Sequence, residues 1–298
     1  YRGSYLTAYN NGDYGVYAFD AVDGVLDHSY ASGSPDAGFY IGQCYPCDAI
    51  VNNVISENNG LGYSGTNSGG SLYIISSVFK NNKGGLAPNT LDSELLPPER
   101  ETFIIGNLIK NNNNIDAPAT QATNLSLGNG VVIAGGNNNI IKNNVIANHN
   151  LYGVIITATA DVNYWPAHGN RVESNLIINS KRADIASSGL SNLGNCFENN
   201  YFNTSIPPGL QTLNKCDSSF YPLSADLSGM WSSLARVIQT SEGNYNQGDW
   251  RSFEAPANQP NMPIMDELIS HGYDKTILPV TKIWKSVKPA VEVFSQYE

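Results

Sequence analysis

Short apolar pairs flanked by asparagine recur along the first two thirds of the chain. The segment "NNVISENNG" at residue 52 returns as "SSVFKNNKG" at 76, "KNNVIANHN" at 142 and "ESNLIINSK" at 173. A second family of apolar segments, each opened by a small residue, lies between them, as in "GVYAF" at 15, "GFYIG" at 38 and "GVVIA" at 130. Four of the six intervals between the seven segments of this second family are 23 or 24 residues. The chain is therefore built from a repeat of about 23 residues.

A repeat of this length with two short strands predicts a solenoid, because one repeat cannot bury its apolar side without a neighbour above and below it. Helical repeats are excluded, since no repeated segment keeps apolar residues at i, i+3 and i+4 for two turns. We therefore predict an all-β fold, a right-handed parallel β-helix of about seven coils over residues 1–216, followed by an irregular, partly helical tail over 217–298. The asparagines suit stacked corners, where they tolerate left-handed backbone and can bond to the asparagine one coil away.

The aligned segments of the second family indicate which side chains face the core. Side chains alternate between the two faces of a strand, so one column is predicted to point inward and the next outward. The inward column contains Val16, Phe39, Tyr63, Leu86, Val131 and Val154, and the outward column contains Tyr17, Tyr40, Ser64, Ala87, Val132 and Ile155. The outward column is unusually apolar, so we expect the C-terminal tail to cover it; the alternative is an exposed binding strip.

The composition limits the classes of partner and the cellular locations that fit the protein. Asp and Glu number 26 against 16 Lys and Arg, for a net charge of −10, and no run of basic residues marks a phosphate track, which argues against nucleic acid as a partner. No apolar stretch approaches the roughly 20 residues of a transmembrane helix. The 38 Asn and 28 Gly, with only 14% charged residues, indicate a turn-rich β protein, for which we predict a secreted, periplasmic or cell-surface location. Because the chain begins with Tyr1 and not Met, we expect it to begin after processing.

Four cysteines form two local pairs, Cys44 with Cys47 and Cys196 with Cys216. An even number of cysteines in an exported protein predicts disulfides, above all for the second pair, which would close a short loop. The first pair, in "CYPC", is compatible with a disulfide, with unpaired structural cysteines, or with redox or metal chemistry. A thioredoxin-like site should begin a helix and a zinc site needs further ligands nearby, and the sequence offers neither, which favours a structural role.

The repeat of asparagine and apolar residues over about residues 5–215 resembles that of right-handed parallel β-helix proteins, a group that includes pectate-lyase-like enzymes, alginate epimerases and NosD-type periplasmic proteins. The stretches "ASGSPDAGFYIGQC" and "GGLAPNTLDSELLPPER" resemble secreted bacterial β-helix proteins of undefined function. This resemblance implies the fold and no particular reaction. The "DPHE" stretch of alginate epimerases is absent, and no run of aspartates on successive coils resembles the calcium site of pectate lyases.

Long loops follow the strands of the second family and, with the coils in register, should lie along one edge of the solenoid. Glycoside hydrolysis needs two carboxyl groups, whereas a lyase or epimerase needs a base, and a cation beside the sugar carboxylate. The candidate catalytic residues on this edge are Asp92, Glu94, Arg100, Asp161 and His168, and the candidate substrate-binding residues are Asn67, Asn89, Tyr164 and Trp165. Each also has a structural interpretation, since acids of the first inserted loop can cap a short helix, Trp165 can pin its loop and Arg100 can form a surface salt bridge.

Two classes of function are consistent with these features. The first, which we favour, is a surface or envelope protein that binds a glycan or acts as a structural scaffold in an assembly, since no catalytic motif is complete. The alternative is a polysaccharide lyase, epimerase or glycoside hydrolase that acts in the groove along the loop edge. Neither class requires a cofactor, although calcium is compatible with both.

The repeat ends after Cys216, where the composition changes. Residues 224–238 are predicted to form an amphipathic helix, and residues 265–273 a second, shorter one. A solenoid end exposes unpaired strand edges, so we expect the tail to cap it. The alternative is that residues 277–294 dock onto another envelope protein.

Overall fold

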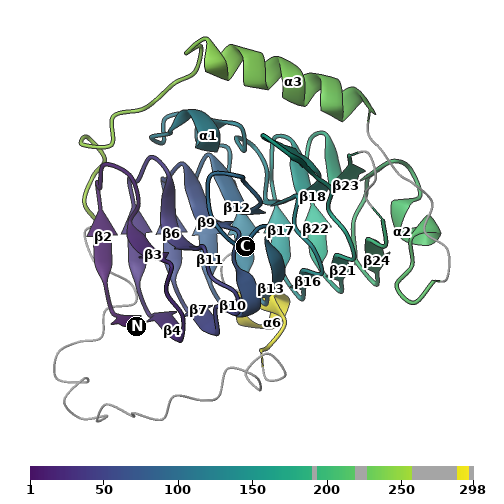
Figure 1. Cartoon of the computed structure of the whole chain (residues 1–298), viewed down its shortest axis with the longest axis horizontal. Coiled ribbons are helices and arrows are strands. Elements are labelled where there is room, and N and C mark those ends of the chain that lie inside the picture. Colours follow the sequence, from purple (N-terminus) through teal and green to yellow (C-terminus); the bar gives the residue numbers. More distant parts are fainter. Residues whose placement is uncertain (190–192, 219–226, 257–286, 295–298) are drawn as a thin grey trace.

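Three parallel β-sheets wind into one elongated solenoid in the computed structural model of the chain (Figure 1). The structure describes residues 1–189, 193–218, 227–256 and 287–294. A full coil contributes one strand to each sheet, and each strand pairs with its counterparts in the coils before and after it. We name the sheets A, B and C, in the order in which the chain enters them.

The strands of each sheet are stacked in chain order. Sheet A contains eight strands: β1 (Arg2–Ser4), β4 (Gly24–Asp27), β7 (Ala49–Asn52), β10 (Gly69–Ile75), β13 (Arg100–Ile105), β16 (Ile140–Lys142), β21 (Arg171–Glu173) and β24 (Cys196–Glu198). Sheet B contains seven: β2 (Thr7–Tyr9), β5 (Tyr30–Ser32), β8 (Ile55–Glu57), β11 (Val78–Lys80), β14 (Leu108–Lys110), β17 (Val145–Ala147) and β22 (Leu176–Ile178). Sheet C contains eight: β3 (Val16–Phe19), β6 (Ala37–Gly42), β9 (Leu61–Thr66), β12 (Gly84–Asn89), β15 (Val131–Ala134), β18 (Tyr152–Thr157), β23 (Ala183–Ser188) and β25 (Ser205–Ile206).

The predicted β-helix is confirmed, but each full coil has three strands and not the two that the repeat suggested. The asparagine-rich segments are not single corners. In "NNVISENNG", strand β8 lies between two corners at Asn53 and Asn58, whose φ angles are 52° and 59°. All seven strands of sheet B are three residues long, and an alternation that short cannot be separated in the sequence from the polar residues on either side.

One apolar cluster fills the centre of the solenoid. The predicted inward column of sheet C is confirmed, because Phe39, Tyr63, Val131 and Val154 are fully buried. The predicted register is confirmed as well, since Phe39 pairs with Val16 on one side and with Tyr63 on the other. The period of the repeat therefore sets the register of sheet C.

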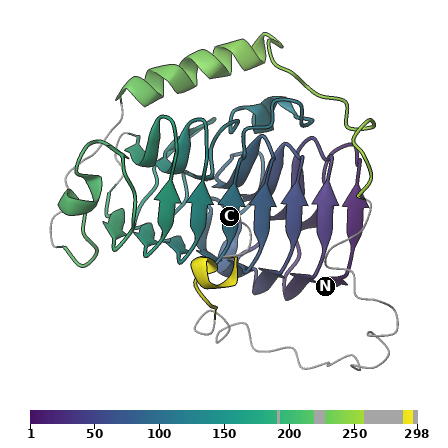
Figure 2. The same ribbon diagram turned by 180° about the vertical axis from the view of Figure 1, so that it is seen from behind.

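The outward column of sheet C has two different environments. Tyr40, Ser64, Ala87 and Ile155 are buried, whereas Tyr17 on the first coil is 50% exposed. An insertion between β14 and β15, which includes helix α1 (Gln121–Asn124), and the long helix α3 (Leu227–Ser241) lie along one side of sheet C (Figures 1 and 2). Most of this column is thus covered and one end is open; that the open end is a binding strip stays a prediction.

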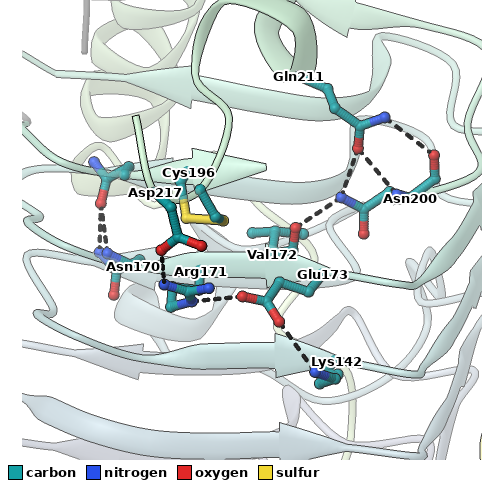
Figure 3. The surroundings of a disulfide bond; sticks show 11 residues. Lys142, Asn170, Arg171, Val172, Glu173, Cys196, Asn200, Gln211 and Asp217 are labelled. Atoms are coloured by element: carbon teal, nitrogen blue, oxygen red, sulfur yellow. Dashed lines mark hydrogen bonds and ion pairs between the residues drawn. A yellow bond between two sulfur atoms is a disulfide. The ribbon is translucent and has the colours of Figure 1, made fainter. Parts of the chain in front are cut away.

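Buried asparagines form ladders at the corners of the coils. Between sheets A and B, Asn144 donates from its backbone N–H and its Nδ2 to the Oδ1 of Asn175, each at 2.9 Å. Asn107 makes the same pair of bonds to Asn144. The ladder ends at Gln211 in helix α2 (Leu210–Leu213), whose Oε1 accepts both bonds from Asn200 (Figure 3). These asparagines satisfy corner backbone groups that lie away from water, as predicted for stacked corners.

Both predicted disulfides are present. The Cys196–Cys216 bond joins β24 on the last coil to the segment that follows α2 (Figure 3). The Cys44–Cys47 bond lies at the corner between β6 and β7, and both of its residues are buried. The "CYPC" motif is therefore a buried disulfide in this structure.

The described part of the tail runs back along the solenoid from its last coil (Figures 1 and 2). Helix α3 corresponds to the helix predicted over 224–238, and its Arg236 Nη1 donates to the Leu127 carbonyl at 3.0 Å. Further on, the Phe253 carbonyl accepts a bond from Asn10 Nδ2 at 2.7 Å, next to the first coil. The tail thus contacts the solenoid both through helix α3 and near the first coil.

Helix α6 (Ala290–Val293) lies on sheet A, on the side away from α3 (Figure 2). The Ala290 N–H donates to the Asn143 carbonyl at 2.9 Å, and Val287 packs against the outer apolar cluster of sheet A. The helix predicted over 265–273 lies outside the described residues, as does most of 277–294. None of the described helices is long and apolar enough to cross a membrane.

Candidate functional site

Two loop insertions meet at the edge where sheet C leads into sheet A. The first insertion follows β12 and spans residues 90–99. The second follows β18, spans residues 158–170 and contains the antiparallel hairpin of β19 (Thr159–Ala160) and β20 (Tyr164–Trp165). Tyr164 is 46% exposed on this hairpin. This is the loop edge on which the sequence places the candidate site.

Three predicted site residues are in contact at this edge. The Asp92 carboxylate accepts hydrogen bonds from the backbone N–H and the Nδ2 of Asn163, at 2.7 and 2.6 Å, and from Trp165 Nε1 at 3.2 Å. The Asp161 carboxylate in turn accepts a bond from the Asp92 N–H at 2.9 Å. The bonds from Asn163 and Trp165 lower the pKa of Asp92, because they favour its ionised form. Asp92 therefore fastens the two insertions together.

Arg100 and His168 lie apart from this contact. Arg100 donates to the Pro98 carbonyl at 2.7 Å, and its guanidinium lies 3.5 Å from the centroid of the Tyr45 ring. His168 Nδ1 accepts a bond from the Leu193 N–H at 3.1 Å. In the part of the chain that the structure describes, no hydrogen bond or ion pair joins Arg100 or His168 to the carboxylates of the two insertions. The five candidate catalytic residues are thus on one edge without forming one cluster.

Glu94 reaches from the first insertion to the outer face of sheet C. Its Oε1 accepts a hydrogen bond from the Tyr40 hydroxyl at 2.5 Å. Asn67 is buried and donates to the Glu94 carbonyl at 2.7 Å, so its amide holds the insertion against the sheet. Asn89 accepts a bond from the Thr66 hydroxyl at 3.0 Å within sheet C. Of the predicted residues, Glu94 alone is placed beside the open end of the outward column.

Four aromatic rings gather at that open end. We call Tyr14, Tyr17, Phe19 and Tyr40 the aromatic platform. The Tyr17 ring centroid lies 4.9 Å from that of Tyr40 and 4.6 Å from that of Tyr14. The rings of Tyr17 and Phe19 are nearly parallel, at 7° and 5.7 Å between centroids, and they are 50% and 38% exposed. The platform therefore presents two neighbouring aromatic side chains to solvent.

Carboxyl groups surround the platform. Burial, and to a lesser extent the nearby charge of Asp13, raises the pKa of Asp36 to about 7, although a hydrogen bond from Tyr14 opposes this shift. Burial also raises the pKa of Glu94, against the effect of its bond from Tyr40. At neutral pH, Asp36 is thus divided between its acid and its carboxylate forms, which is a common property of residues at functional sites.

Sequence reasoning missed Asp13, Tyr14 and Asp36. Asp13 and Asp36 are 23 residues apart, one repeat, and the Asp36 N–H donates to the Asp13 carbonyl at 2.9 Å. This spacing was available in the sequence as two acids stacked on successive coils. Among the described residues, no group of three His, Cys, Asp or Glu side chains is placed to hold a metal ion, so the compatibility with calcium stays a prediction.

Three long parallel sheets in one solenoid define the chain as a right-handed parallel β-helix protein. No protein-family model matches the sequence, and no curated protein matches it. Solved structures similar to this chain include the periplasmic alginate epimerase AlgG, with 14% identity and a TM-score of 0.49 over 65% of this chain and 44% of that one. They also include the A-module of the mannuronan C-5 epimerase AlgE4 of Azotobacter vinelandii, with 16% identity and a TM-score of 0.41 over 68% of this chain and 56% of that one. The chain thus spans about half the length of either structure.

Proposed function

We propose that the protein binds polysaccharide on the outer face of sheet C, with Tyr17 and Phe19 of the aromatic platform as the contact surface. The observation that carries this proposal is the pair of exposed, nearly parallel rings on β3. One face of a sugar ring carries mainly C–H groups, which are slightly positive and pack well on the electron-rich face of an aromatic ring. Because β3 belongs to a solenoid, the two rings are held in place before the ligand arrives.

Polar groups beside the platform suit the hydroxyl groups of a sugar. Asp36 can donate or accept a hydrogen bond near pH 7, since its pKa is about 7. The Glu94 carboxyl and the Tyr40 hydroxyl already form a hydrogen bond, and a sugar hydroxyl could extend it. A small number of polar groups around apolar contacts is the usual composition of a ligand site.

The proposed role places the protein outside the cytoplasm, in the secreted, periplasmic or cell-surface compartment. Two disulfides support this location, because such bonds persist in oxidising compartments. A scaffold role in an envelope assembly is part of the same proposal, with the C-terminal tail as the segment that contacts other envelope proteins.

A glycan array followed by calorimetric titration tests the binding proposal. We expect Tyr17→Ala to weaken binding of the strongest array ligand by about tenfold, since the lost ring contact is worth roughly 1.4 kcal/mol. Tyr201→Ala is the matched control, because Tyr201 is 68% exposed on the last coil and should leave binding unchanged. Equal affinities for wild type and Tyr17→Ala would overturn the proposal.

A second candidate function is cleavage or epimerisation of the bound polysaccharide, as a lyase, epimerase or glycoside hydrolase. The observation that favours it is the raised pKa of Asp36, which keeps a proton available near pH 7 for a general acid. Glu94 and Asp13 are the neighbouring carboxyl groups that could act as base or nucleophile.

Product assays separate this second function from binding. If Asp36 acts as an acid, reducing-end or unsaturated products should form with wild type and fall by at least about a hundredfold with Asp36→Asn, while array binding persists. The rate should decline as pH rises through about 7, where Asp36 loses its proton. Loss of product in Asp161→Ala or Arg100→Ala, with Asp36→Asn active, would instead move the reaction to the loop edge.

A further inference from the structure

A depression of about 610 Å³ lies at the corners between sheets B and C, away from the aromatic platform. Eight asparagines line it together with His149 and Lys181. No carboxyl group is among these residues, although the chain carries a net charge of −10. The depression shares no lining residue with the platform, so the function proposed above does not account for it.

The repeat itself produces the asparagine lining. Five of the asparagines occupy the same left-handed corner position on five successive coils, with φ between 54° and 62°: Asn58, Asn81, Asn111, Asn148 and Asn179. Left-handed backbone is tolerated by asparagine and glycine, so the fold explains a small residue here. The result is one amide per coil in a straight row, with steps of about 4.8 Å.

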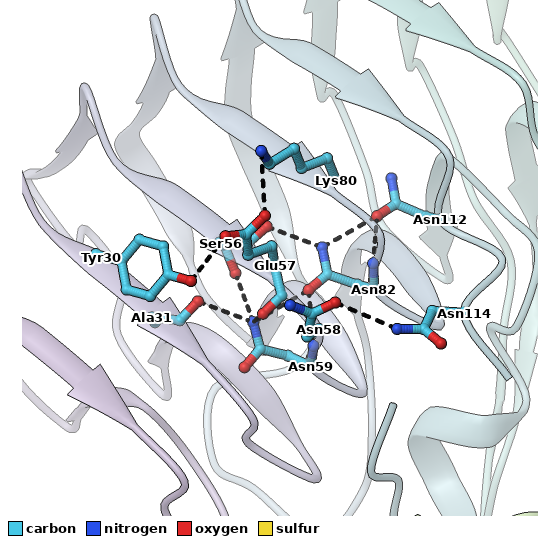
Figure 4. A network of polar contacts seen from close by, with 10 residues as sticks. All are labelled: Tyr30, Ala31, Ser56, Glu57, Asn58, Asn59, Lys80, Asn82, Asn112 and Asn114. Carbon is cyan, nitrogen blue, oxygen red and sulfur yellow. Dashed lines mark hydrogen bonds and ion pairs between the residues drawn. The ribbon is translucent and has the colours of Figure 1, made fainter. Parts of the chain in front are cut away.

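Hydrogen bonds orient three of the five amides in this row relative to one another. Asn179 Nδ2 donates to Asn148 Oδ1 at 3.2 Å, and Asn148 Nδ2 donates to Asn111 Oδ1 at 3.1 Å. At the other end, Asn114 Nδ2 donates to Asn58 Oδ1 at 3.3 Å (Figure 4). Amides that are oriented in this way present their other donors and acceptors to a ligand without further ordering.

Two polar atoms of the residues that line the depression, His149 Nδ1 and Lys181 Nζ, have no hydrogen-bond partner among the described residues. The His149 side chain is 1% exposed, its Nε2 faces the Ile109 carbonyl at 3.3 Å, and its Nδ1 has no hydrogen-bond partner. Because the Nε2 must carry the proton to bond a carbonyl, Nδ1 is an acceptor. Burial lowers the pKa of His149 to about 4, so the ring is neutral at pH 7. Lys181 is exposed, and its ammonium group makes no hydrogen bond or ion pair there.

We propose that this depression is a second carbohydrate subsite, which takes a neutral oligosaccharide along the amide row. An amide offers a donor and an acceptor side by side, which matches vicinal hydroxyl groups, and a row with one amide per coil fits a chain of repeating sugars. Lys181 donates to a hydroxyl at one end. Eight uncharged amides make up most of the lining, which fits an uncharged ligand.

Substitution of asparagine by glycine tests the subsite without straining the corner, because glycine also adopts positive φ. We expect the double variant Asn81→Gly, Asn111→Gly to weaken binding of a neutral hexasaccharide from a panel of glucans and mannans by roughly tenfold, as expected for the loss of two hydrogen bonds. Asn199→Gly is the matched control, since Asn199 has a φ of 54° outside the depression. The readout is calorimetric titration together with the side-chain amide signals of ¹⁵N-labelled protein.

The outcomes separate this subsite from the platform. The proposal is supported if the double variant Asn81→Gly, Asn111→Gly loses affinity while Asn199→Gly binds as wild type does. The ligand should then also shift only the side-chain amide signals of the amide row. If Tyr17→Ala is the only variant that loses affinity for the neutral hexasaccharide, all neutral-sugar binding is on the platform, and the proposed subsite is overturned. Binding of a polyuronate with no binding of the neutral hexasaccharides also overturns it, because the ligand would then be an anion that Lys181 recognises.

Discussion

Asn144→Ala should lower the free energy of unfolding by about 4 kcal/mol, the largest loss we expect from a single polar substitution in this chain. The substitution removes the acceptor of the N–H and Nδ2 groups of Asn107 and the donor to the Ile104 carbonyl. All three groups lie in a buried corner, where an unsatisfied polar group costs roughly 1–3 kcal/mol. Urea unfolding followed by circular dichroism measures the change.

The exposed Asn203 provides the comparison for this prediction. Asn203→Ala should change the free energy of unfolding by less than about 0.5 kcal/mol, because its side chain is outside the ladder. A loss below about 1 kcal/mol for Asn144→Ala would contradict the role of the ladder and would mean that water or a shifted neighbour satisfies the corner.

Stability should fall by about 2 kcal/mol as pH rises from 6.5 to 8, and Glu99 should cause most of this fall. Glu99 is fully buried, and its carboxylate oxygens accept bonds from Thr102 Oγ1 at 2.7 Å and from Asn139 Nδ2 at 2.8 Å. Burial raises its pKa to about 8 against these bonds, from an ordinary value of 4.5. Between these values the folded protein holds a proton that the unfolded chain has lost, so stability decreases as pH rises, by about 1.4 kcal/mol per pH unit.

Between pH 6.5 and 8, other titratable groups contribute little to the change in stability. The pKa of His149 is lowered to about 4, so this residue has the opposite effect, and that effect is complete once pH passes its ordinary value of 6.5. The pKa of Asp36 is about 7, so Asp36 adds a smaller fall at the start of the window. Glu99→Gln mimics the protonated acid, and it should remove most of the decline measured by urea unfolding at each pH. A decline of the same size in Glu99→Gln would show that another group is responsible.

The core of sheet C could be predicted from the sequence because two periods act together there. Alternation places Phe39 and Tyr63 inward, and the 23-residue repeat brings them into register. The limits of the strands of sheet B could not be predicted, since three residues between two polar corners carry too little pattern. The burial of Glu99, at the end of the first insertion, could not be predicted either, because its environment depends on Asn139 in the next coil.

The candidate site, too, could be predicted only in part from the sequence. The sequence places Asp92 and Asp161 on one edge, and the structure brings them together because the insertions follow strands in register. Arg100 and His168 are on that edge too, but the paths of non-repeating loops depend on tertiary contacts, which direct them elsewhere. The aromatic platform was anticipated only through the apolar outward column; its carboxyl partner Asp36 became apparent from burial and from the neighbouring coil.

Amide hydrogen exchange with and without the strongest ligand of the glycan array tests the central claim most directly, because it locates the binding surface without a substitution. Binding at the platform predicts slower exchange in β3, in β6 and in the 90–99 insertion that carries Glu94, with little change in the strands of sheet A. Slower exchange confined to the corners between sheets B and C would assign that ligand to the amide row alone. Saturating ligand with no protection in β3 or β6 would contradict glycan binding on the outer face of sheet C.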